Sequence, residues 1–246
     1  IYNVILANQG GTQGIRYHTI LAGKKEDPTH MNTCCEGQGT RMLGSLPEHI
    51  YSLADDGVYV NLYEPSTLQW SQSGRTVQWK MTTQFPFQPE VRLHTSAVES
   101  VPARVHIRVP SWAAKEMPIR VNGSLAVTGQ PGSYAEIDRT WKDGDIISFT
   151  LPIALRLPRY QGDDQIPGKQ QYAVEYGPIL MAVIGSADAT LQVKNGEYPE
   201  DVLRQINAKS GEPLHFQVEH NPGAELMPYW KVDKESFTCL PVIEVA

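Results

Sequence analysis

The segment Arg104-Val105-His106-Ile107-Arg108-Val109 alternates strictly between polar and apolar residues. Such alternation is typical of a β-strand with one buried face, because successive side chains of a strand point to opposite sides of the sheet. We therefore predict that Val105, Ile107 and Val109 lie on one face of this strand.

Comparable short segments follow one another from residue 56 onward, and turn signals separate them. The dipeptide Asn122-Gly123 is one such signal, since it favours the tight turn of a β-hairpin. Short strands at this spacing predict a β-sandwich or barrel rather than alternating strands and helices. Further strands are predicted at residues 58–63, 77–83, 119–121, 134–138 and 146–151, and, after a surface loop at 161–168, at 172–175, 179–184, 214–218 and 236–245, with a short helix at 199–208.

The first 55 residues differ in character from the rest. Residues 1–7 are apolar and are typical of the end of a helix. Apolar residues then recur at helical spacing at Leu43, Leu46, Ile50 and Leu53. Pro47 interrupts this pattern, which predicts either a kinked helix or two helices in tandem. We predict a mainly β fold in three parts, with a helical part at 1–55, a β-sandwich at 56–160 and a second β-rich domain at 161–246.

The charge and hydropathy pattern excludes some classes of partner. The chain has 246 residues, a formal net charge of −6 and no long basic run. A nucleic-acid or anionic-membrane partner needs a positive footprint, so neither is expected. The longest apolar run, residues 178–184, is too short to cross a bilayer. Because the chain begins at Ile1 inside an apolar run, we expect it to be cut from a longer protein, and its compartment stays open.

Three cysteines do not form a disulfide framework. Cys34 and Cys35 are adjacent, and neighbouring Cα atoms are too close for ordinary disulfide geometry. Cys239 lies in a strand-like segment, where a buried free thiol is the simplest interpretation.

The adjacent cysteines lie at the predicted start of a helix. Thr33 and Glu36 have the spacing of a capping box, with Thr33 as the N-cap. Cys34 and Cys35 then fall in the first turn, where unpaired N–H groups and the helix dipole stabilise an anion. A thiol there is expected to lose its proton more easily, and the thiolate is both the nucleophile and the metal ligand.

The residues alone leave three interpretations of this pair. Both cysteines could be small buried apolar residues. They could form half of a zinc site, for which His30 is the nearest further ligand in sequence. Cys34 could also be a nucleophile, which needs a general acid or base within reach.

Other residues are weaker candidates for a binding site. Arg41 follows on the same predicted helix and could bind a polar substrate, although a solvated helix face explains it equally well. Tyr17, with His18 beside it, could line a pocket or belong to an ordinary loop. The five tryptophans could stack on sugars, but burial in a core is the favoured interpretation for tryptophans in strands. They are Trp70, Trp79, Trp112, Trp141 and Trp230.

Several segments, in order along most of the chain, resemble the bacterial β-L-arabinofuranosidases of glycoside hydrolase family 127 and its relatives. The most specific are the Cys34-Cys35 helix and the run Ala54-Asp55-Asp56-Gly57-Val58-Tyr59-Val60-Asn61-Leu62-Tyr63. Looser matches are Tyr2-Asn3 with Leu6-Ala7, Arg108-Val109-Pro110-Ser111-Trp112-Ala113, Val121-Asn122-Gly123, and Gly177-Pro178-Ile179-Leu180.

The resemblance implies an (α/α)₆ catalytic barrel followed by β-sandwich domains, and a zinc ion bound by one Glu and three Cys. It assigns Cys34 as nucleophile and zinc ligand and Cys35 as a second zinc ligand. The implied reaction is a retaining double displacement with a glycosyl-cysteine intermediate, in which a thiolate replaces the usual nucleophilic carboxylate. Residues 1–55 would then be the C-terminal end of the barrel, with Tyr17 and Arg41 as candidate substrate-binding residues.

The chain departs from the family pattern upstream of the cysteine pair. The family's other zinc ligands and its acid/base Glu precede the pair, but residues 1–33 contain no cysteine, and Glu26 is their only glutamate. The run Cys-Cys-Glu-Gly-Gln-Gly also differs from the Cys-Cys-Pro-Pro form of some members. We therefore expect zinc in the complete site only, and no hydrolysis by this chain alone. Its expected partners are a carbohydrate substrate and the missing N-terminal barrel portion.

Two rival functions remain open at this point. A stand-alone β-sandwich that binds carbohydrate or a partner protein would show two or more exposed Trp or Tyr rings in a row. A cysteine-dependent redox or acyl-transfer enzyme would need a histidine near Cys34, and only His18 and His30 are close in sequence. The glycosidase hypothesis instead predicts an under-packed surface on residues 1–55, which can mediate self-association.

Overall fold

The computed structural model describes residues 1–10, 14–26, 34–163, 165–185, 189–194 and 198–245. The chain is mainly β, as predicted, and divides into two compact units. One unit combines Ile1–Arg41 with Leu155–Ala246, and the other is Met42–Ala154. None of the described helices is long and apolar enough to span a membrane.

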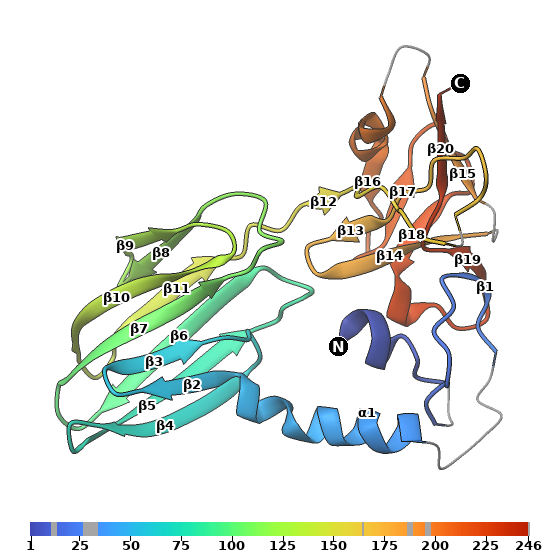
Figure 1. The fold of residues 1–246 in the computed structure, drawn as a ribbon. Helices are drawn as coiled ribbons and strands as arrows, with labels where there is room; N and C mark the ends of the chain where they lie inside the picture. The colour runs from blue at the N-terminus through green and yellow to red at the C-terminus, as the bar shows by residue number, and fades with distance from the viewer. Residues whose placement is uncertain (11–13, 27–33, 164, 186–188, 195–197, 246) are drawn as a thin grey trace. The chain divides into compact units, whose positions relative to one another are not determined.

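The unit Met42–Ala154 contains two sheets (Figure 1). The four-stranded sheet has the order β10 (Ser133–Trp141), β7 (Val101–Val109), β3 (Gly57–Val60) and β2 (Tyr51–Ala54). The six-stranded sheet has the order β4 (Ser66–Gln72), β5 (Arg75–Thr83), β6 (Glu90–Ala97), β11 (Ile146–Thr150), β8 (Met117–Val121) and β9 (Ser124–Gly129). All neighbouring strands in them are antiparallel except β3 and β7, which are parallel.

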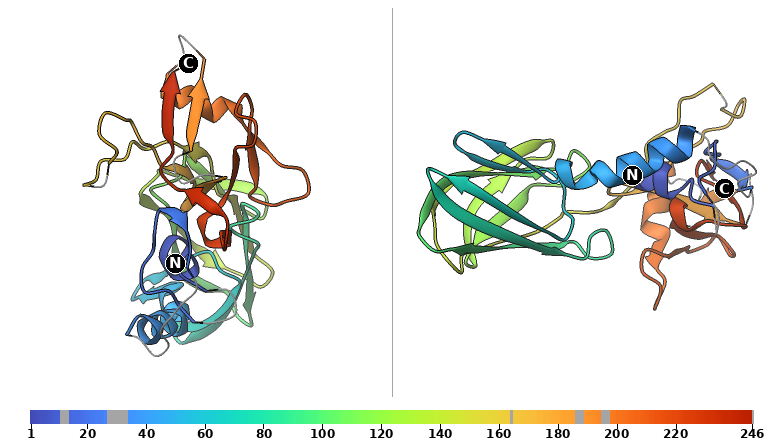
Figure 2. Two further views of the ribbon diagram at one scale, coloured as in Figure 1. Left: turned by 90° about the vertical axis from the view of Figure 1, so that its right-hand side faces the viewer. Right: turned by 90° about the horizontal axis from the view of Figure 1, so that it is seen from below.

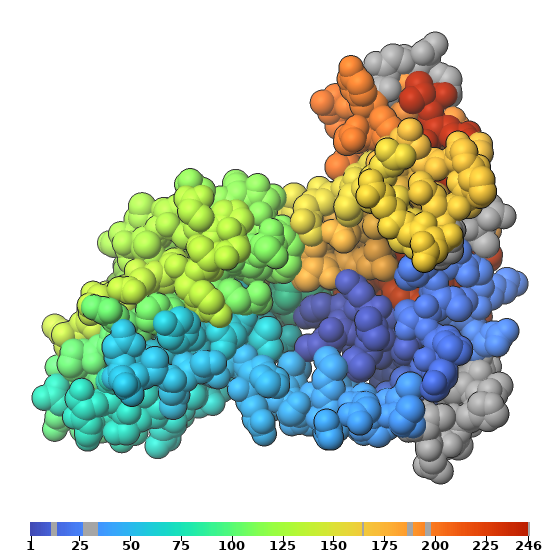
Figure 3. All heavy atoms as spheres, viewed as in Figure 1, coloured from blue at the N-terminus to red at the C-terminus, as the bar shows by residue number. Residues whose placement is uncertain are grey.

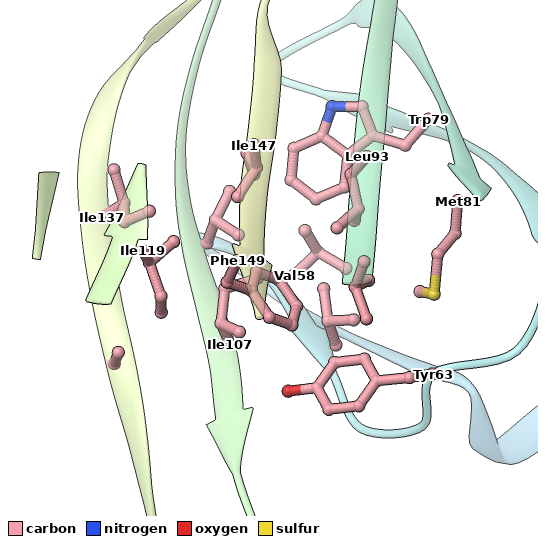
Figure 4. Packing of buried hydrophobic residues seen from close by; sticks show 14 of the residues in the cluster. Val58, Tyr63, Trp79, Met81, Leu93, Ile107, Ile119, Ile137, Ile147 and Phe149 are labelled. Atoms are coloured by element: carbon pink, nitrogen blue, oxygen red, sulfur yellow. The ribbon is translucent and has the colours of Figure 1, made fainter. Parts of the chain in front are cut away.

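One hydrophobic core lies between these sheets, so the predicted sandwich is confirmed (Figure 4). Val58 and Ile107 reach the core from the four-stranded sheet, and Leu93, Ile119 and Ile147 reach it from the six-stranded sheet. The valines of β7 at positions 105 and 109 are fully buried, as the alternation predicted. Figure 2 shows the two layers in its right-hand view.

Three tryptophans pack against one another within this core. Trp79 packs edge-on against Trp70 and Trp141, with ring centroids 4.7 and 5.6 Å apart. All three rings are buried, and Trp112 and Trp230 are half-buried, so the core interpretation is confirmed for the first three.

The buried indole N–H groups of Trp79 and Trp141 predict different costs for the same substitution. Trp141 Nε1 donates a hydrogen bond to the Ala103 carbonyl oxygen at 3.0 Å, whereas Trp79 Nε1 has no partner among the described residues. Both side chains are at most 1% exposed, so replacement by phenylalanine removes similar volume. We expect Trp141→Phe to lower the free energy of unfolding by about 1 kcal/mol more than Trp79→Phe. Urea titration of the two variants measures this difference, and equal losses would contradict it.

The other unit is built on an eight-stranded sheet (Figure 1). Its main path is β1 (Ala22–Lys24), β19 (Ser236–Thr238), β14 (Ile179–Ile184), β18 (Glu225–Pro228), β17 (Phe216–Val218) and β16 (Ile206–Ala208). Two further strands, β12 (Leu155–Arg156) and β13 (Val174–Tyr176), join it at β14. A separate parallel pair consists of β15 (Thr190–Val193) and β20 (Val242–Val245), visible side by side in Figure 2.

Short helices complete both units. The π-helix η1 (Tyr2–Leu6) lies where the end of a helix was expected. The α-helix α1 (Cys34–Ser45) is followed directly by the 3₁₀ helix η2 (Leu46–His49), so of the two predicted alternatives, a kinked helix or two tandem helices, the structure shows the second. The predicted helix at 199–208 is the 3₁₀ helix η3 (Pro199–Gln205) followed by β16, and η4 (Tyr229–Lys231) follows β18.

The prediction of helix through Leu53 is wrong. Residues 51–54 form β2, which pairs with β3 through Leu53 and Val58. Leu53 is 60% exposed, whereas Ile50 is buried in the sandwich core. The helical spacing of Leu53 is therefore a coincidence, because pairing with β3 determines the backbone conformation there.

Candidate functional site

Cys34 is the first described residue of α1, and Cys35 follows it in the first turn. Thr33 and His30 lie outside the described residues, so the capping box and the histidine ligand stay predictions. Cys34 and Cys35 are helical, as predicted, and both thiols are free.

Helix geometry separates the two cysteines. Residues four and seven positions apart return to the same face of an α-helix, so Cys34, Gln38 and Arg41 form one stripe. All three are exposed. Cys35 is offset by about 100° and shares its face with Gly39, the helix's buried residue. Cys34 is therefore the accessible thiol, and Arg41 lies about 10 Å further along the same face.

Gly39 marks where α1 packs on its own unit. A Cβ atom at Gly39 would lie 2.6 Å from Cδ1 of Ile15 and 4.0 Å from Cδ1 of Ile5. The absence of a side chain thus permits close contact between the helix and the N-terminal segment.

The end of α1 and the start of η2 leave apolar side chains partly exposed. Met42 and Leu43 are each 38% exposed, and Leu46 is only half-buried. The space-filling view shows the helix at the surface (Figure 3). The partial exposure of Met42, Leu43 and Leu46 agrees with the under-packed surface that the glycosidase hypothesis predicts for residues 1–55. Ile50 does not, because it is buried in the sandwich core. A stand-alone carbohydrate-binding sandwich predicts a row of exposed Trp or Tyr rings. The described tryptophans are buried or half-buried and do not form such a row, whereas Tyr134 on β10 is an exposed ring of the sandwich unit.

The pKa of Cys35 is raised above its ordinary value, chiefly by desolvation and then by its hydrogen bond with Cys34. Glu36 adds a repulsive negative charge. A position at a helix N-terminus alone is expected to lower the pKa of a thiol, so the raised pKa of Cys35 is opposite to that expectation. The pair therefore needs a cation or another partner to hold two thiolates side by side.

The other predicted site residues are exposed. Tyr17 is 59% exposed and meets the His18 ring edge to face, with centroids 4.6 Å apart. Among the described residues, neither Tyr17 nor Arg41 makes an ion pair or a side-chain hydrogen bond. Only Arg41 shares a helix face with Cys34, so helix geometry supports Arg41 more strongly than Tyr17 as a neighbour of the thiol.

The described residues do not by themselves fit a zinc ion. No group of three or more His, Cys, Asp or Glu side chains able to hold a metal occurs in the part of the chain that the structure describes. Structural zinc sites use four protein ligands and catalytic ones usually three. Cys34 and Cys35 could supply two thiolates, and further ligands would have to come from elsewhere.

Buried cations, which sequence reasoning missed, hold the segment before α1 on the C-terminal sheet. Lys25 is 6% exposed, and its Nζ donates to the carbonyl oxygens of Ala7 (2.9 Å) and Tyr229 (2.8 Å). It also lies 4.1 Å from the centre of the Tyr229 ring. Arg16, equally buried, donates to the carbonyl oxygens of Gln9 and Glu26. Arg16 also pairs with the carboxylate of Asp233 at 3.4 Å. No local signal distinguishes these two residues from solvated ones, because Tyr229 and Asp233 lie more than 200 residues along the chain.

The stability of the chain should depend on the protonation of Lys25. Burial, and next the positive charge of Arg16, lowers the pKa of Lys25 to about 8 from 10.5. Between these values the unfolded chain holds a proton that the folded chain has released, so Lys25 makes the folded state gain stability as pH rises through this window. The gain is at most about 1.4 kcal/mol per pH unit.

This dependence can be isolated with Lys25→Met. We expect the free energy of unfolding of the wild type, minus that of Lys25→Met, to rise between pH 8 and pH 10. Other titrating groups are common to both proteins and cancel in the difference. Denaturant titrations at several pH values measure it, and a flat or falling difference would show that Lys25 keeps its proton in the folded state.

The sequence of the sandwich unit matches a known protein family. Residues 57–153 match the family described as beta-L-arabinofuranosidase, GH127 middle domain. This range contains most of the sandwich unit. A search of curated proteins gave no match.

Solved structures share the fold of nearly the whole chain. A glycoside hydrolase superposes with a TM-score of 0.76 at 19% identity, covering 98% of this chain and 47% of that one. A GH127 beta-L-arabinofuranosidase from Geobacillus stearothermophilus T6 gives 0.70 at 19% identity, with coverages of 97% and 44%. A GH127 beta-arabinofuranosidase gives 0.72 at 19% identity, with the same coverages. The chain thus spans less than half the length of these proteins.

The sequence segments, the family match and the shared fold agree with one another. The resemblance to the GH127 β-L-arabinofuranosidases is thereby confirmed, by a family match over residues 57–153 and by a common fold over nearly the whole chain.

Proposed function

We propose that this chain is the C-terminal part of a retaining glycoside hydrolase that cleaves arabinofuranosides or related sugars, with Cys34 as the nucleophile. The observation that carries this proposal is the exposed Cys34 in the first turn of a helix that precedes the segment matching the GH127 middle domain. An exposed thiol close to partly exposed apolar residues suits a site that another part of the protein completes.

In this proposal the Cys34 thiolate attacks the anomeric carbon while the bond to the leaving oxygen breaks. An acid protonates that oxygen, and water then releases the sugar from sulfur with overall retention of configuration. Arg41, about two turns further along the same face, would bind oxygen atoms of the sugar. The acid/base residue belongs to a portion of the protein outside this chain, since the sequence before Cys34 offers Glu26 as its only glutamate.

Zinc is part of the same proposal because the family resemblance implies it. Cys34 and Cys35 are two soft ligands of the type that zinc prefers, and they are too few to form a site. Because thiols must lose protons to bind metal, and the pKa of Cys35 is raised, we expect the isolated chain to bind zinc weakly or not at all.

The test compares the complete gene product with the 246-residue chain on an aryl β-L-arabinofuranoside. The complete protein should release the sugar with β-configuration as the first product, observed by NMR, and the isolated chain should show no turnover. Inversion of configuration would exclude the double displacement. Turnover by the isolated chain at the rate of the complete protein would refute the proposal that part of the active site lies outside this chain. Absence of glycosidase activity in both proteins would refute the proposed function.

A further inference from the structure

The outer face of the six-stranded sheet carries a shallow hollow of about 340 Å³. It lies over β6, β11 and β8, which are neighbours in the sheet (Figure 1). Its volume is in the range of small-ligand sites. The side chains that line it on the solvent side are Glu90, Arg92, Pro118, Arg120, Ser148 and Thr150. All of them belong to the sandwich unit.

Strand register places two arginines around one serine. Ser148 on β11 faces Arg92 on β6 and Arg120 on β8. Neighbouring strands lie about 4.8 Å apart, so the Cα atoms of the two arginines are about 10 Å apart with the serine midway. Two guanidinium groups at this separation can both reach one anion held above the Ser148 hydroxyl.

The arginines retain capacity to bind such an anion. Arg92 makes no ion pair or side-chain hydrogen bond with any described residue. Arg120 uses one nitrogen, Nη1, to donate to the Gly123 carbonyl oxygen at 3.2 Å. A guanidinium has five N–H donors, so most of those on both residues are available.

The surface around the hollow is mainly positive, whereas the whole chain has a negative net charge. Lys80 and His94 pair across β5 and β6 on the outward positions next to Arg92. The outward positions of β5, β6, β11 and β8 near the hollow carry one negative charge, on Glu90, and the positive charges of Lys80, Arg92 and Arg120. The whole chain carries a net charge of −6, so this positive surface is local and attracts an anionic ligand against the overall charge.

The remaining lining residues favour a sugar acid over a nucleic acid. The hydroxyls of Ser148 and Thr150 and the carboxylate of Glu90 can exchange hydrogen bonds with sugar hydroxyls. Pro118 offers a small apolar surface. The lining residues include no exposed aromatic ring on which a base could stack, and Glu90 repels a continuous phosphate backbone.

We propose that this hollow is a non-catalytic binding site for carbohydrate chains that contain uronic acids, with one carboxylate held between Arg92 and Arg120 above Ser148. Guanidinium groups bind carboxylates through paired, charge-assisted hydrogen bonds, which fits this arrangement. The site lies apart from the Cys34 helix in sequence and does not depend on the hydrolysis proposed above.

The test uses the 246-residue chain and a trisaccharide of galacturonic acid, with the neutral galactose trisaccharide as reference. Calorimetric titration should show binding of the acidic sugar and none of the neutral one. Arg92→Gln should weaken binding at least about tenfold, because a charged hydrogen-bond partner is lost. Raising NaCl from about 50 to 500 mM should weaken it as well, since these charges are exposed to screening.

The matched control is Arg75→Gln. Arg75 is an exposed arginine of the same sheet that already contacts the Ser100 carbonyl oxygen (2.7 Å) and Glu99 (3.4 Å), outside the hollow. It should leave binding unchanged, and all variants should melt at the wild-type temperature. Absence of binding, equal binding of the neutral trisaccharide, no effect of Arg92→Gln, or tighter binding of a short single-stranded oligonucleotide would each overturn the proposal.

Discussion

Replacing Cys34 by alanine in the complete protein is expected to abolish glycoside hydrolysis, with a loss of about 10⁴-fold or more in kcat. The reason is that the proposed mechanism has no first step without its nucleophile, and loss of a nucleophile in covalent catalysis has effects of this size. In the 246-residue chain, where Cys34 is exposed, the same substitution should leave the melting temperature unchanged. Turnover of an aryl β-L-arabinofuranoside measures the loss.

The matched control for this result is Cys239→Ala. Cys239 is fully buried in a hydrophobic cluster of the C-terminal unit, and burial raises the pKa of its thiol far above the ordinary value. It can therefore be neither an accessible nucleophile nor a thiolate, and its removal should cost some stability but leave kcat intact. If Cys34→Ala kept more than about a tenth of the activity, or if both variants lost it equally, Cys34 would not be the nucleophile.

Replacing Gly57 by alanine should produce a large loss of stability in the sandwich unit. A Cβ atom at Gly57 would overlap the carbonyl oxygen of Arg104 and lie 2.7 and 2.8 Å from its carbonyl carbon and nitrogen. These atoms belong to the backbone of β7, which is parallel to β3 at this point, so no side-chain rotation can relieve the contact. We expect a loss of about 3 kcal/mol in the free energy of unfolding.

Gly44→Ala is the control, because a Cβ atom at Gly44 meets nothing within 4 Å. Gly44 lies in α1, where alanine is the better helix former, so stability should rise by up to about 1 kcal/mol. Urea denaturation of the 246-residue chain measures both variants. A Gly57→Ala protein within about 0.5 kcal/mol of the wild type would show that β3 and β7 can separate without cost.

The sandwich could be predicted because its signal is local. Alternation in β7 identifies the buried valines, and the family-like run around Gly57 coincides with β3 and the residues that follow it. Leu53 shows the limit of such patterns. It continues a helical spacing, but its backbone pairs with Val58 across a hairpin, and that pairing determines its conformation.

The placement of the N-terminal segment could not be predicted. Its strand β1 pairs with β19, more than 200 residues later, and Lys25 binds the carbonyl of Tyr229. Partnerships between distant backbone groups leave no trace in local composition. In the same way, the pairing of Arg92 and Arg120 around Ser148 requires the register of three strands, which the sequence does not show.

The candidate site was partly accessible to sequence reasoning. Helical spacing alone brings Arg41 to the face of Cys34, and the structure has both residues exposed on that face. Tyr17 has no such geometric link to Cys34, so its role rests on its residue type. The raised pKa of Cys35 needed the structure, because it results from desolvation and the hydrogen bond to Cys34.

The account rests on Cys34 carrying the sugar during turnover, and one measurement tests this most directly. The complete protein is quenched in acid during hydrolysis of an arabinofuranoside with an activated leaving group, and its peptides are mapped by mass spectrometry. We predict that the peptide containing Cys34 gains the mass of one pentosyl group, and that fragmentation places the group on its sulfur. A pentosyl group found on a carboxylate, or on another residue, would contradict the account.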